Sequence, residues 1–332
     1  MEIGRQKAAL IADAAKRLAG YPRDLLTRLG GDDCWSKMVQ RGNALLEHAP
    51  ADHRAELRAF GEVAGIDRDQ GVVANTMVDM YRGGLGCSSL SVNPERSATG
   101  GPLFGRNLDF YSLGVLHRFG LVTVHRPEGK RAFVSIGFPG LFGCLSGMND
   151  AGLAVAVHEV LLAGDRSPLF NPKGVPYTFV LRRILEECAT VEEAEKLVRA
   201  AQRTTKLNIA LCDRRGGAVL EMTPKTVALR RGENGICACT NHFRTPELIV
   251  FALCRRYPIL VRAESIPKLD VAAVAKKLDE VHQGPRTVQT MIFEPGPLVL
   301  HLAMGSCPSS SLPLKRLELA PLLGPRAGKA AP

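Results

Sequence analysis

The spacing of apolar residues changes once along this chain, and that change constrains the fold more than any other feature of the sequence. Before residue 87, segments such as IADAAKRLAG, WSKMVQRGNALLEHA and HRAELRAFGEVAG place apolar residues three and four positions apart, which is typical of amphipathic helices. After residue 87, most segments alternate with a period of two, which predicts strands. We therefore expect a helical N-terminal part followed by a larger, strand-rich part.

The strand-rich part contains nine segments with this alternation, separated by Gly, Asn, Asp or Pro. The links RPEGK, MNDAG and DRRGG are typical of hairpins. The predicted strands are CSSLSV, LFGRNLDF, GLVTVHR, AFVSIGF, AGLAVAVHEV, LNIALCD, GAVLEMT, KTVALRR and GICACTN. The run TVQTMIFEPGPLVLHLAMG adds a later hairpin.

Helices are expected within the strand-rich part as well. The segments YTFVLRRILEECA, TVEEAEKLVRAAQR and VAAVAKKLDEVHQ have helical spacing, and Thr190 and Glu193 are spaced as in a capping box. In the N-terminal part, breaks are expected at Gly20–Pro22 and Gly30–Gly31. Antiparallel strands with helices grouped between them predict an α+β fold with two sheets covered by helices. The last ~10 residues, rich in Pro, Gly and Ala, are expected to be loose.

Charge divides at the same position as the apolar spacing. Residues 1–86 hold twelve basic and twelve acidic residues, whereas residues 87–332 hold 31 basic and 21 acidic ones and carry the whole formal charge of +10. Such a surface can favour anionic substrates, although a merely solvated basic surface is the simpler interpretation. The absence of a basic run or an aromatic-interleaved basic stripe argues against nucleic-acid binding.

Membrane insertion and secretion are not indicated by the sequence. No window approaches the ~18 apolar residues that span a bilayer. The first twenty residues carry scattered charges and are typical of an amphipathic helix rather than a secretory signal, so a cytoplasmic location is expected. A signal removed before this start is left open.

The nine cysteines are odd in number and scattered, which favours a reducing compartment over a disulfide framework. The tightest group is Cys237, Cys239 and His242. A structural zinc site needs four ligands, and no second pair lies at matching spacing. The alternative is a strand in which small thiols alternate with Ile236 and Ala238. We expect neither a metal nor a cofactor.

Cys87 lies directly after the permissive stretch GLG. Most buried cysteines are inert, and a thiol needs a base to become an efficient nucleophile. A free α-amine, which titrates near ~8, is an economical base, but it exists only if the Gly86–Cys87 bond is broken. Gly86 suits such a break because it has no Cβ. Residues 1–86 would then be a pro-segment or small subunit, and residues 87–332 the catalytic body.

Two further motifs contain candidate partners of Cys87. If 87–92 and 102–110 pair as a hairpin, Arg106 and Asp109 of GRNLDF lie close to Cys87, where a guanidinium favours the thiolate and a carboxylate can orient an amine. The alternative is a surface ion pair of little energetic value. Asn241 of TNHF could donate hydrogen bonds to an oxyanion, or it could cap a turn.

Together, the order and spacing of these motifs, with GMNDAGLAV between them, resemble the penicillin acyltransferase-like (isopenicillin N acyltransferase) family of self-cleaving cysteine N-terminal-nucleophile (Ntn) hydrolases. Acid ceramidase, N-acylethanolamine acid amidase and choloylglycine hydrolase are more distantly similar. The resemblance covers about residues 40–320 and implies a four-layer αββα sandwich.

The resemblance also implies roles for single residues. Cys87 would cleave the chain and then be the nucleophile, Arg106 and Asp109 match the GRNxD motif that holds the nucleophile and its amine, and Asn241 matches the oxyanion-stabilising Asn. The family also tends to place Ser and Arg downstream. Arg256 is a further candidate there, although Cys254 stands near the position where serine is usual.

The implied activity is hydrolysis of carbon–nitrogen bonds other than peptide bonds, or acyl transfer, through a Cys87 acyl-enzyme. The expected partner is a small N-acyl amide or acyl thioester, and the oligomeric state is left open. Two alternatives stand: a non-catalytic binding protein that keeps the sandwich, and an acyl-coenzyme A-dependent acyltransferase. Substrate identity cannot be inherited from fold.

Other motifs are weaker. Ser88 and Ser89 lack a GxSxG elbow, and His158–Glu159 lacks the second histidine of HExxH. GFPGLFG at 137–143 could supply backbone donors beside the site.

Overall fold

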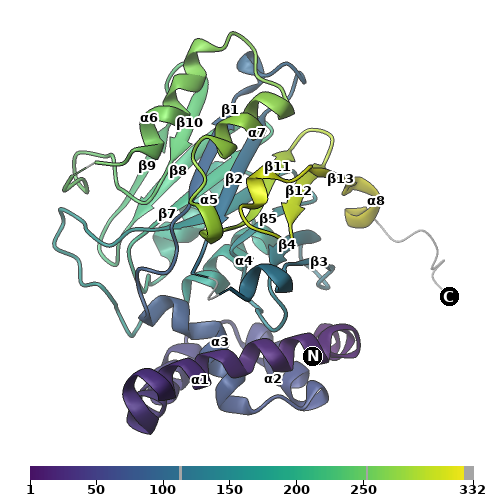
Figure 1. Ribbon diagram of the computed structural model, residues 1–332, viewed down its shortest axis with the longest axis vertical. Coiled ribbons are helices and arrows are strands. Elements are labelled where there is room, and N and C mark those ends of the chain that lie inside the picture. The colour runs from purple at the N-terminus through teal and green to yellow at the C-terminus, as the bar shows by residue number, and fades with distance from the viewer. Residues whose placement is uncertain (112–113, 252, 325–332) are drawn as a thin grey trace.

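Two antiparallel sheets form the body of the computed structural model, which describes residues 1–111, 114–251 and 253–324 (Figure 1). The six-stranded sheet has the order β10-β1-β2-β11-β12-β13. Its strands are β1 (Ser88–Val92), β2 (Leu103–Asp109), β10 (Ile236–Cys239), β11 (Thr287–Glu294), β12 (Val299–Met304) and β13 (Lys315–Glu318).

The seven-stranded sheet follows chain order from β3 to β9. Its strands are β3 (Leu121–His125), β4 (Phe133–Gly137), β5 (Ser146–Asn149), β6 (Ala154–Glu159), β7 (Leu207–Asp213), β8 (Gly216–Met222) and β9 (Val227–Arg231). The three expected hairpin links join β3 to β4, β5 to β6 and β7 to β8. The nine expected strands all form, and the structure adds the short strands β5 and β13.

Helices cover the outer faces of both sheets. Helices α4 (Tyr177–Glu187) and α5 (Val191–Ala200) pack on the seven-stranded sheet, and α6 (Arg256–Val261) and α7 (Val271–Asp279) pack on the six-stranded sheet. A last short helix, α8, spans Ala320–Leu323. The layers therefore run helix, sheet, sheet, helix, which confirms the expected α+β sandwich.

Strand β10 explains why cysteines alternate with apolar residues near residue 237. Ile236 and Ala238 belong to the core between the six-stranded sheet and α6–α7. Cys237 and Cys239 point the other way, into the core between the two sheets. The cysteines of β10 are thus small core residues.

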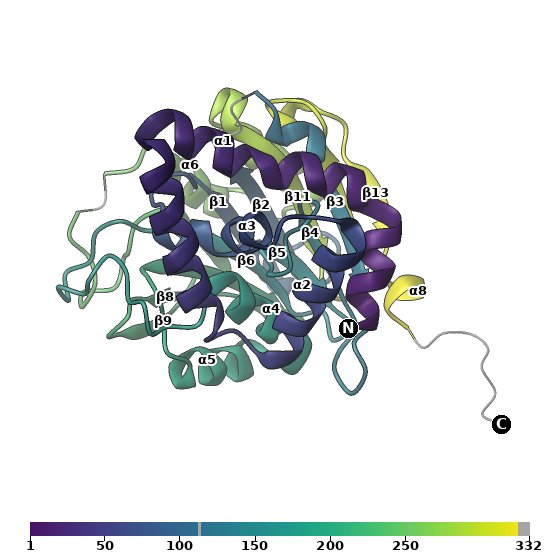
Figure 2. The ribbon, with the colours of Figure 1, turned by 90° about the horizontal axis from the view of Figure 1, so that it is seen from below.

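Three helices form the N-terminal part: α1 (Glu2–Leu46), α2 (Ala51–Ala64) and α3 (Arg68–Met80). They pack together across one end of the sandwich, as the view from below shows (Figure 2). The expected break at Gly30–Gly31 occurs, because Gly31 has φ 68° and interrupts the helix. The expected break at Gly20–Pro22 was wrong, because α1 continues through Pro22. Leu18 packs against the core of the sandwich and the Tyr21 ring meets Phe119 edge to face, with centroids 6.4 Å apart, so tertiary contacts offset the local cost of proline.

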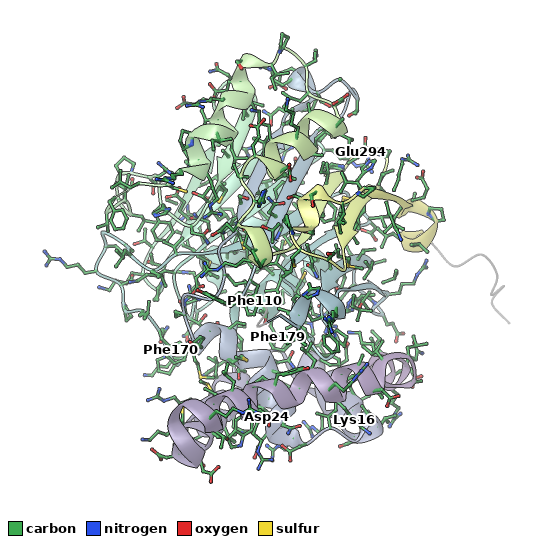
Figure 3. The ribbon with its side chains drawn as sticks, viewed as in Figure 1. Lys16, Asp24, Phe110, Phe170, Phe179 and Glu294 are labelled. Carbon is green, nitrogen blue, oxygen red and sulfur yellow. The ribbon has the colours of Figure 1, made fainter. Side chains whose placement is uncertain are left out.

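The N-terminal helices share a core with the sandwich. Phe179 of α4, labelled in Figure 3, lies on the side of the sandwich that faces α1 and α3, in one cluster with Ala15, Leu46 and Phe60. The rings of Phe60 and Phe142 meet edge to face, with centroids 5.0 Å apart. This contact makes the helical part an integral layer of the uncleaved chain.

Buried charges cross the same interface. Arg182 of α4 donates to Glu56 of α2 at 2.5 Å and to Glu186 at 2.7 Å, and Lys7 of α1 donates to Glu56 at 2.9 Å. His53 of α2 bonds Glu186 at 2.8 Å. Burial opposes ionisation of Glu186, but the His53 hydrogen bond and the Arg182 charge lower its pKa to about 2. Removing one member would leave a buried charge without its partner, so the cluster fixes α1 and α2 on the sandwich.

The helix cap, the membrane spans and the C-terminal tail were also addressed by the sequence. Thr190 caps α5 by accepting a hydrogen bond from the Glu193 amide at 3.3 Å, as expected. Among the described residues, no helix combines the length and apolarity that a membrane span requires. The tail expected to be loose falls almost entirely beyond Gly324, outside the described residues.

Candidate active site

Cys87 lies at the start of β1, next to the central pair of the six-stranded sheet, and its side chain is fully buried. The residues before it continue alongside β2: Leu85 bridges Phe110, and the Gly86 amide donates to the Asp109 carbonyl at 2.8 Å. The bond between Gly86 and Cys87 therefore sits inside a defined strand-like segment.

The backbone of Cys87 is held at both ends by two side chains. The Cys87 amide donates to Asn241 Oδ1 at 2.8 Å, and the Cys87 carbonyl accepts from Arg256 Nη1 at 2.7 Å. Arg256 Nη2 also donates to Asn241 Oδ1, at 2.8 Å, and so fixes the amide orientation. Asn241 follows β10 and Arg256 begins α6, so both come from the edge of the sheet that flanks β1.

Arg106 is the charged partner of the thiol. Strands β1 and β2 form the expected hairpin, with Ser89 opposite Arg106. Arg106 Nη2 lies 3.5 Å from Cys87 Sγ, and Nη1 donates to the Val157 carbonyl at 2.6 Å. Burial raises the pKa of the Cys87 thiol, and the Arg106 charge opposes that rise.

Asp109 lies near Cys87 at the end of β2. Its Oδ1 accepts from Thr287 Oγ1 at 2.6 Å, and its Oδ2 accepts from Gln283 Nε2 at 2.7 Å and lies 3.5 Å from Arg256 Nη1. Burial raises the pKa of Asp109, while the hydrogen bonds from Thr287 and Gln283 lower it. In the uncleaved chain its carboxylate therefore contacts neighbours of Cys87 rather than the Cys87 amide itself.

Gln283 belongs to the site, and sequence reasoning missed it. It follows α7, and its Nε2 donates to the Gly86 carbonyl at 2.8 Å. A Cβ at residue 86 would lie 2.6 Å from that nitrogen. A side chain at residue 86 would therefore displace the end of the Gln283 side chain, and glycine lets this donor reach the Gly86 carbonyl.

Glu159 is the second site residue that sequence reasoning missed, because its surroundings in the sequence resemble only an incomplete HExxH motif. Its carboxylate accepts from the amides of Gly83 at 2.7 Å and Leu85 at 2.9 Å, and it pairs with Arg82 Nε at 2.9 Å. Its backbone carbonyl accepts from Asn241 Nδ2 at 2.8 Å. Glu159 therefore fixes the strand that leads to Cys87, whereas its neighbour His158 is a buried core residue.

The remaining candidates make no hydrogen bond to the Cys87 thiol among the described residues. Cys254 precedes α6 and is partly exposed. Cys237 and Cys239 face the inter-sheet core, while His242 contacts the Phe251 ring. Ser88 and Ser89 are buried on β1.

Among the described residues, one group of potential metal ligands lies close together: Asp52, His53 and Glu186. Lys130 Nζ bridges the two carboxylates, at 2.7 Å from each. The ammonium therefore supplies the positive charge there, and the group belongs to the interface cluster described above.

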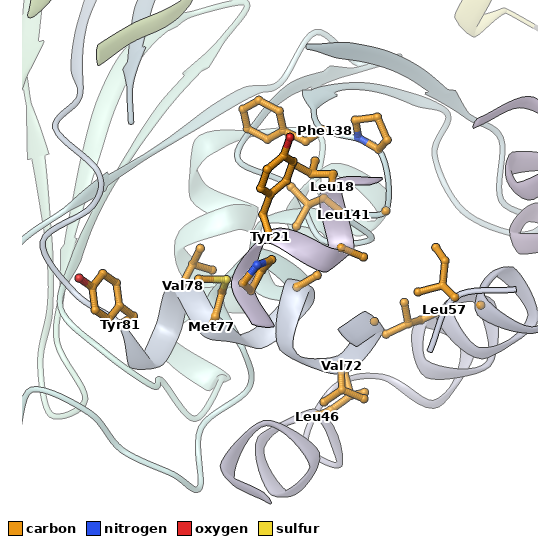
Figure 4. A pocket seen from close by; sticks show the side chains of 18 of the residues that line it. Leu18, Tyr21, Leu46, Leu57, Val72, Met77, Val78, Tyr81, Phe138 and Leu141 are labelled. Carbon is orange, nitrogen blue, oxygen red and sulfur yellow. The ribbon is translucent and has the colours of Figure 1, made fainter. Parts of the chain in front are cut away.

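A large cavity lies between the N-terminal helices and the sandwich, beside the core that the two parts share (Figure 4). It has a volume of about 1150 Å³, and apolar side chains dominate its wall. The wall includes Leu18, Val72, Val78, Phe138 and Leu141, and it extends to Leu85 and Glu159 beside the Cys87 site. Residues 138–141 of GFPGLFG thus line the cavity.

Residues 96–280 match the family of acyl-coenzyme A:6-aminopenicillanic acid acyl-transferase. The matched residues make up more than half of the chain, which decides its family. The chain belongs to this acyl-transferase family. The match contains Arg106, Asp109, Asn241 and Arg256 and begins shortly after Cys87.

Similarity to an individual curated protein is more distant. An uncharacterized protein of Archaeoglobus fulgidus is 26% identical over an alignment of 243 positions, which covers 64% of this chain and 39% of that protein. The chain thus matches well under half of that relative.

The chain is also similar to solved structures. The Caenorhabditis elegans ortholog of N-acylethanolamine-hydrolyzing acid amidase has a TM-score of 0.50 and 17% identity, over 63% of this chain and 93% of that chain. A mutant of the conjugated bile acid hydrolase from Clostridium perfringens has a TM-score of 0.49 and 16% identity, over 70% and 92%. The first likeness confirms the Ntn-hydrolase fold that the sequence predicts.

Proposed function

We propose that this protein is a self-processing cysteine amidohydrolase or acyltransferase, with Cys87 as its nucleophile. The proposal rests on the polar contacts around Cys87. Asn241 accepts from its amide, Arg256 donates to its carbonyl, and Arg106 lies next to its thiol. An inert buried cysteine needs no such set of charged and polar partners.

Self-processing would begin with attack of the Cys87 sulfur on the Gly86 carbonyl carbon. The new C–S bond forms, the Gly86–Cys87 C–N bond breaks, and the thiol proton passes to the departing nitrogen. Water then hydrolyses the thioester, which leaves a carboxylic acid at Gly86 and a free thiol and α-amine at Cys87. The products are a small chain of residues 1–86 and a large chain of residues 87–332.

In the processed protein, the α-amine of Cys87 would act as the base for its own thiol. A free α-amine titrates close to neutral pH, so it can accept the thiol proton as the sulfur attacks a substrate carbonyl. Arg106 favours the thiolate, and Asp109 and Asn241 lie where they can bind the new amine. The substrate amine leaves with that proton, and the thioester passes its acyl group to water or to an acceptor amine.

The cavity supports a substrate with a bulky apolar acyl group. Its volume of about 1150 Å³ exceeds the range of roughly 300–1,000 Å³ typical of small-molecule sites, and its wall is mostly apolar. It ends at Leu85 and Glu159, beside the segment whose departure would expose Cys87. The family description and the amidase neighbour both name acyl chemistry, which agrees with an N-acyl amide.

A reducing compartment such as the cytoplasm suits this mechanism. All nine cysteines are free thiols in the structure, and a nucleophilic thiol must stay reduced.

Turnover of N-acyl amides tests the proposal. Purified protein is incubated with a panel of amides whose acyl chains increase in length, and acid release is compared with transfer to an added amine. We expect turnover that rises with acyl length and disappears in Cys87→Ala. A protein that is cleaved but turns over no acyl amide, and whose Cys87 fails to react with an acyl-directed thiol probe, would instead be the non-catalytic binding protein.

A further inference from the structure

The carbonyl that self-processing must attack already has a hydrogen-bond donor. Gly86 O accepts from Gln283 Nε2 at 2.8 Å, and this is its only hydrogen bond within the described residues. A donor at this distance from the attacked carbonyl stabilises the negative charge that develops on oxygen in the tetrahedral transition state.

Asn241 is committed elsewhere in the uncleaved chain. Its Nδ2 donates to Leu85 O at 3.1 Å and to Glu159 O at 2.8 Å, and its Oδ1 accepts from the Cys87 amide and Arg256. A side-chain amide has two N–H donors, so both are already used. Asn241 therefore holds the leaving nitrogen and the strand before it, and it does not face the Gly86 oxygen.

We propose that the two reactions of Cys87 use different oxyanion donors: Gln283 serves self-cleavage, and Asn241 becomes available only afterwards. Departure of residues 83–86 removes Leu85 O, which frees one Asn241 N–H for the substrate carbonyl. This inference rests on the self-processing proposed above and assigns its catalytic donor.

The neighbours of Gln283 fix its orientation. Nε2 faces two acceptors, Gly86 O and, at 2.7 Å, Asp109 Oδ2, so the opposite amide orientation would set oxygen against oxygen. The backbone amide of Gln283 donates to Thr287 Oγ1 at 2.8 Å, and Thr287 Oγ1 in turn donates to Asp109 Oδ1. The donor is thus positioned before reaction, as electrostatic stabilisation requires.

In the cleavage step, the Cys87 sulfur bonds to the Gly86 carbonyl carbon as the π electrons move onto Gly86 O. Gln283 Nε2 donates its hydrogen bond to this oxygen. The electrons return as the C–N bond breaks, and the thiol proton goes to the Cys87 nitrogen, which Asn241 Oδ1 holds. No further reactant is consumed until water enters at the thioester.

The experiment follows self-cleavage of the full chain by intact mass after cell-free synthesis. Gln283→Met keeps the side-chain length but removes the donor, and we expect cleavage to slow by roughly 10²–10³-fold. Gln289→Met is the control, because Gln289 Nε2 donates to Gly137 O at 3.1 Å and not to a group around Cys87. Gln289 is fully buried whereas Gln283 is partly exposed, so this control is the more demanding of the two substitutions for the fold. Gln283→Ala, which introduces no bulk, provides a second variant if Gln283→Met fails to melt cooperatively.

Hydroxylamine separates the two halves of the reaction, because it cleaves thioesters directly. We expect it not to restore cleavage in Gln283→Met, since the slowed step precedes the thioester. Wild-type rates in both Gln283 variants, or full restoration by hydroxylamine, would overturn the inference while leaving self-processing intact. A wild-type chain that never cleaves would instead refute the proposed function.

Discussion

The carbonyl oxygen of Cys87 accepts a 2.7 Å hydrogen bond from Nη1 of Arg256, a residue 169 positions further along the chain. The same guanidinium donates to Asn241 Oδ1 at 2.8 Å. One planar group therefore sets the position of the Cys87 backbone and the orientation of the Asn241 side-chain amide. A lysine carries the same charge but cannot make two fixed hydrogen bonds of this geometry.

Arg256→Lys should for this reason reduce turnover by about 10-fold or more, because the two hydrogen bonds of the guanidinium cannot both be kept. Arg255→Lys is the matched control, since Arg255 is the exposed neighbour at the start of α6. Steady-state kinetics on one amide substrate measures the effect. Unchanged turnover in Arg256→Lys would show that Arg256 acts only through its charge, because lysine keeps that charge.

Asp79 should make the stability of the uncleaved chain depend on pH. This buried α3 residue accepts from the Tyr177 amide at 3.0 Å and from Thr204 Oγ1 at 2.5 Å, and burial raises its pKa from 3.8 to about 7. The folded state therefore binds the proton more tightly than the unfolded state. The stabilisation is complete below the unfolded pKa and is lost as pH rises through about 7.

Denaturant unfolding of full-length Cys87→Ala, which stays in one piece, measures this contribution. Between about pH 5 and about pH 8, we expect Asp79 to remove on the order of 3 kcal/mol from the free energy of unfolding. Adding Asp79→Asn, which mimics the neutral acid, should flatten the pH dependence, whereas Asp24→Asn at an exposed position of α1 should not. A pH dependence that Asp79→Asn leaves unaltered would rule out this role.

The cavity wall gives a prediction about acyl length. Ala74 of α3 lines the cavity, and Ala74→Trp should fill part of its volume of about 1150 Å³. Turnover of long-chain amides should then fall by about 10-fold or more, while short-chain amides should be affected far less, because only long chains reach this depth. Ala200→Trp, at the exposed end of α5, is the control. A uniform loss across chain lengths would place the acyl group elsewhere.

The sequence predicts the part of the site that lies within one hairpin. Apolar alternation sets the register of β1 and β2, and this register brings Arg106 and Asp109 to Cys87. Asn241 could be named because its motif ends a strand and resembles the family pattern. Arg256 was only a further candidate, because Cys254 stands near the position where the family pattern has serine.

Gln283 and Glu159 could not be predicted in the same way. Each binds backbone groups of residues 83–86, and backbone groups leave no signal in residue type. The contacts span 74 or more residues, so no local pattern reports them. Strands β5 and β13 were missed for related reasons: SGMN has no β-branched residue, and KRLE is a mostly exposed edge strand.

Intact mass spectrometry of the purified wild-type chain and Cys87→Ala, run beside an amide turnover assay, tests the central claim most directly. We expect the wild type to yield two chains, residues 1–86 and residues 87–332, with Cys87 at the new N-terminus. We expect Cys87→Ala to yield one inactive chain of 332 residues. An active protein in which Cys87 is still joined to Gly86, or an active Cys87→Ala variant, would contradict it.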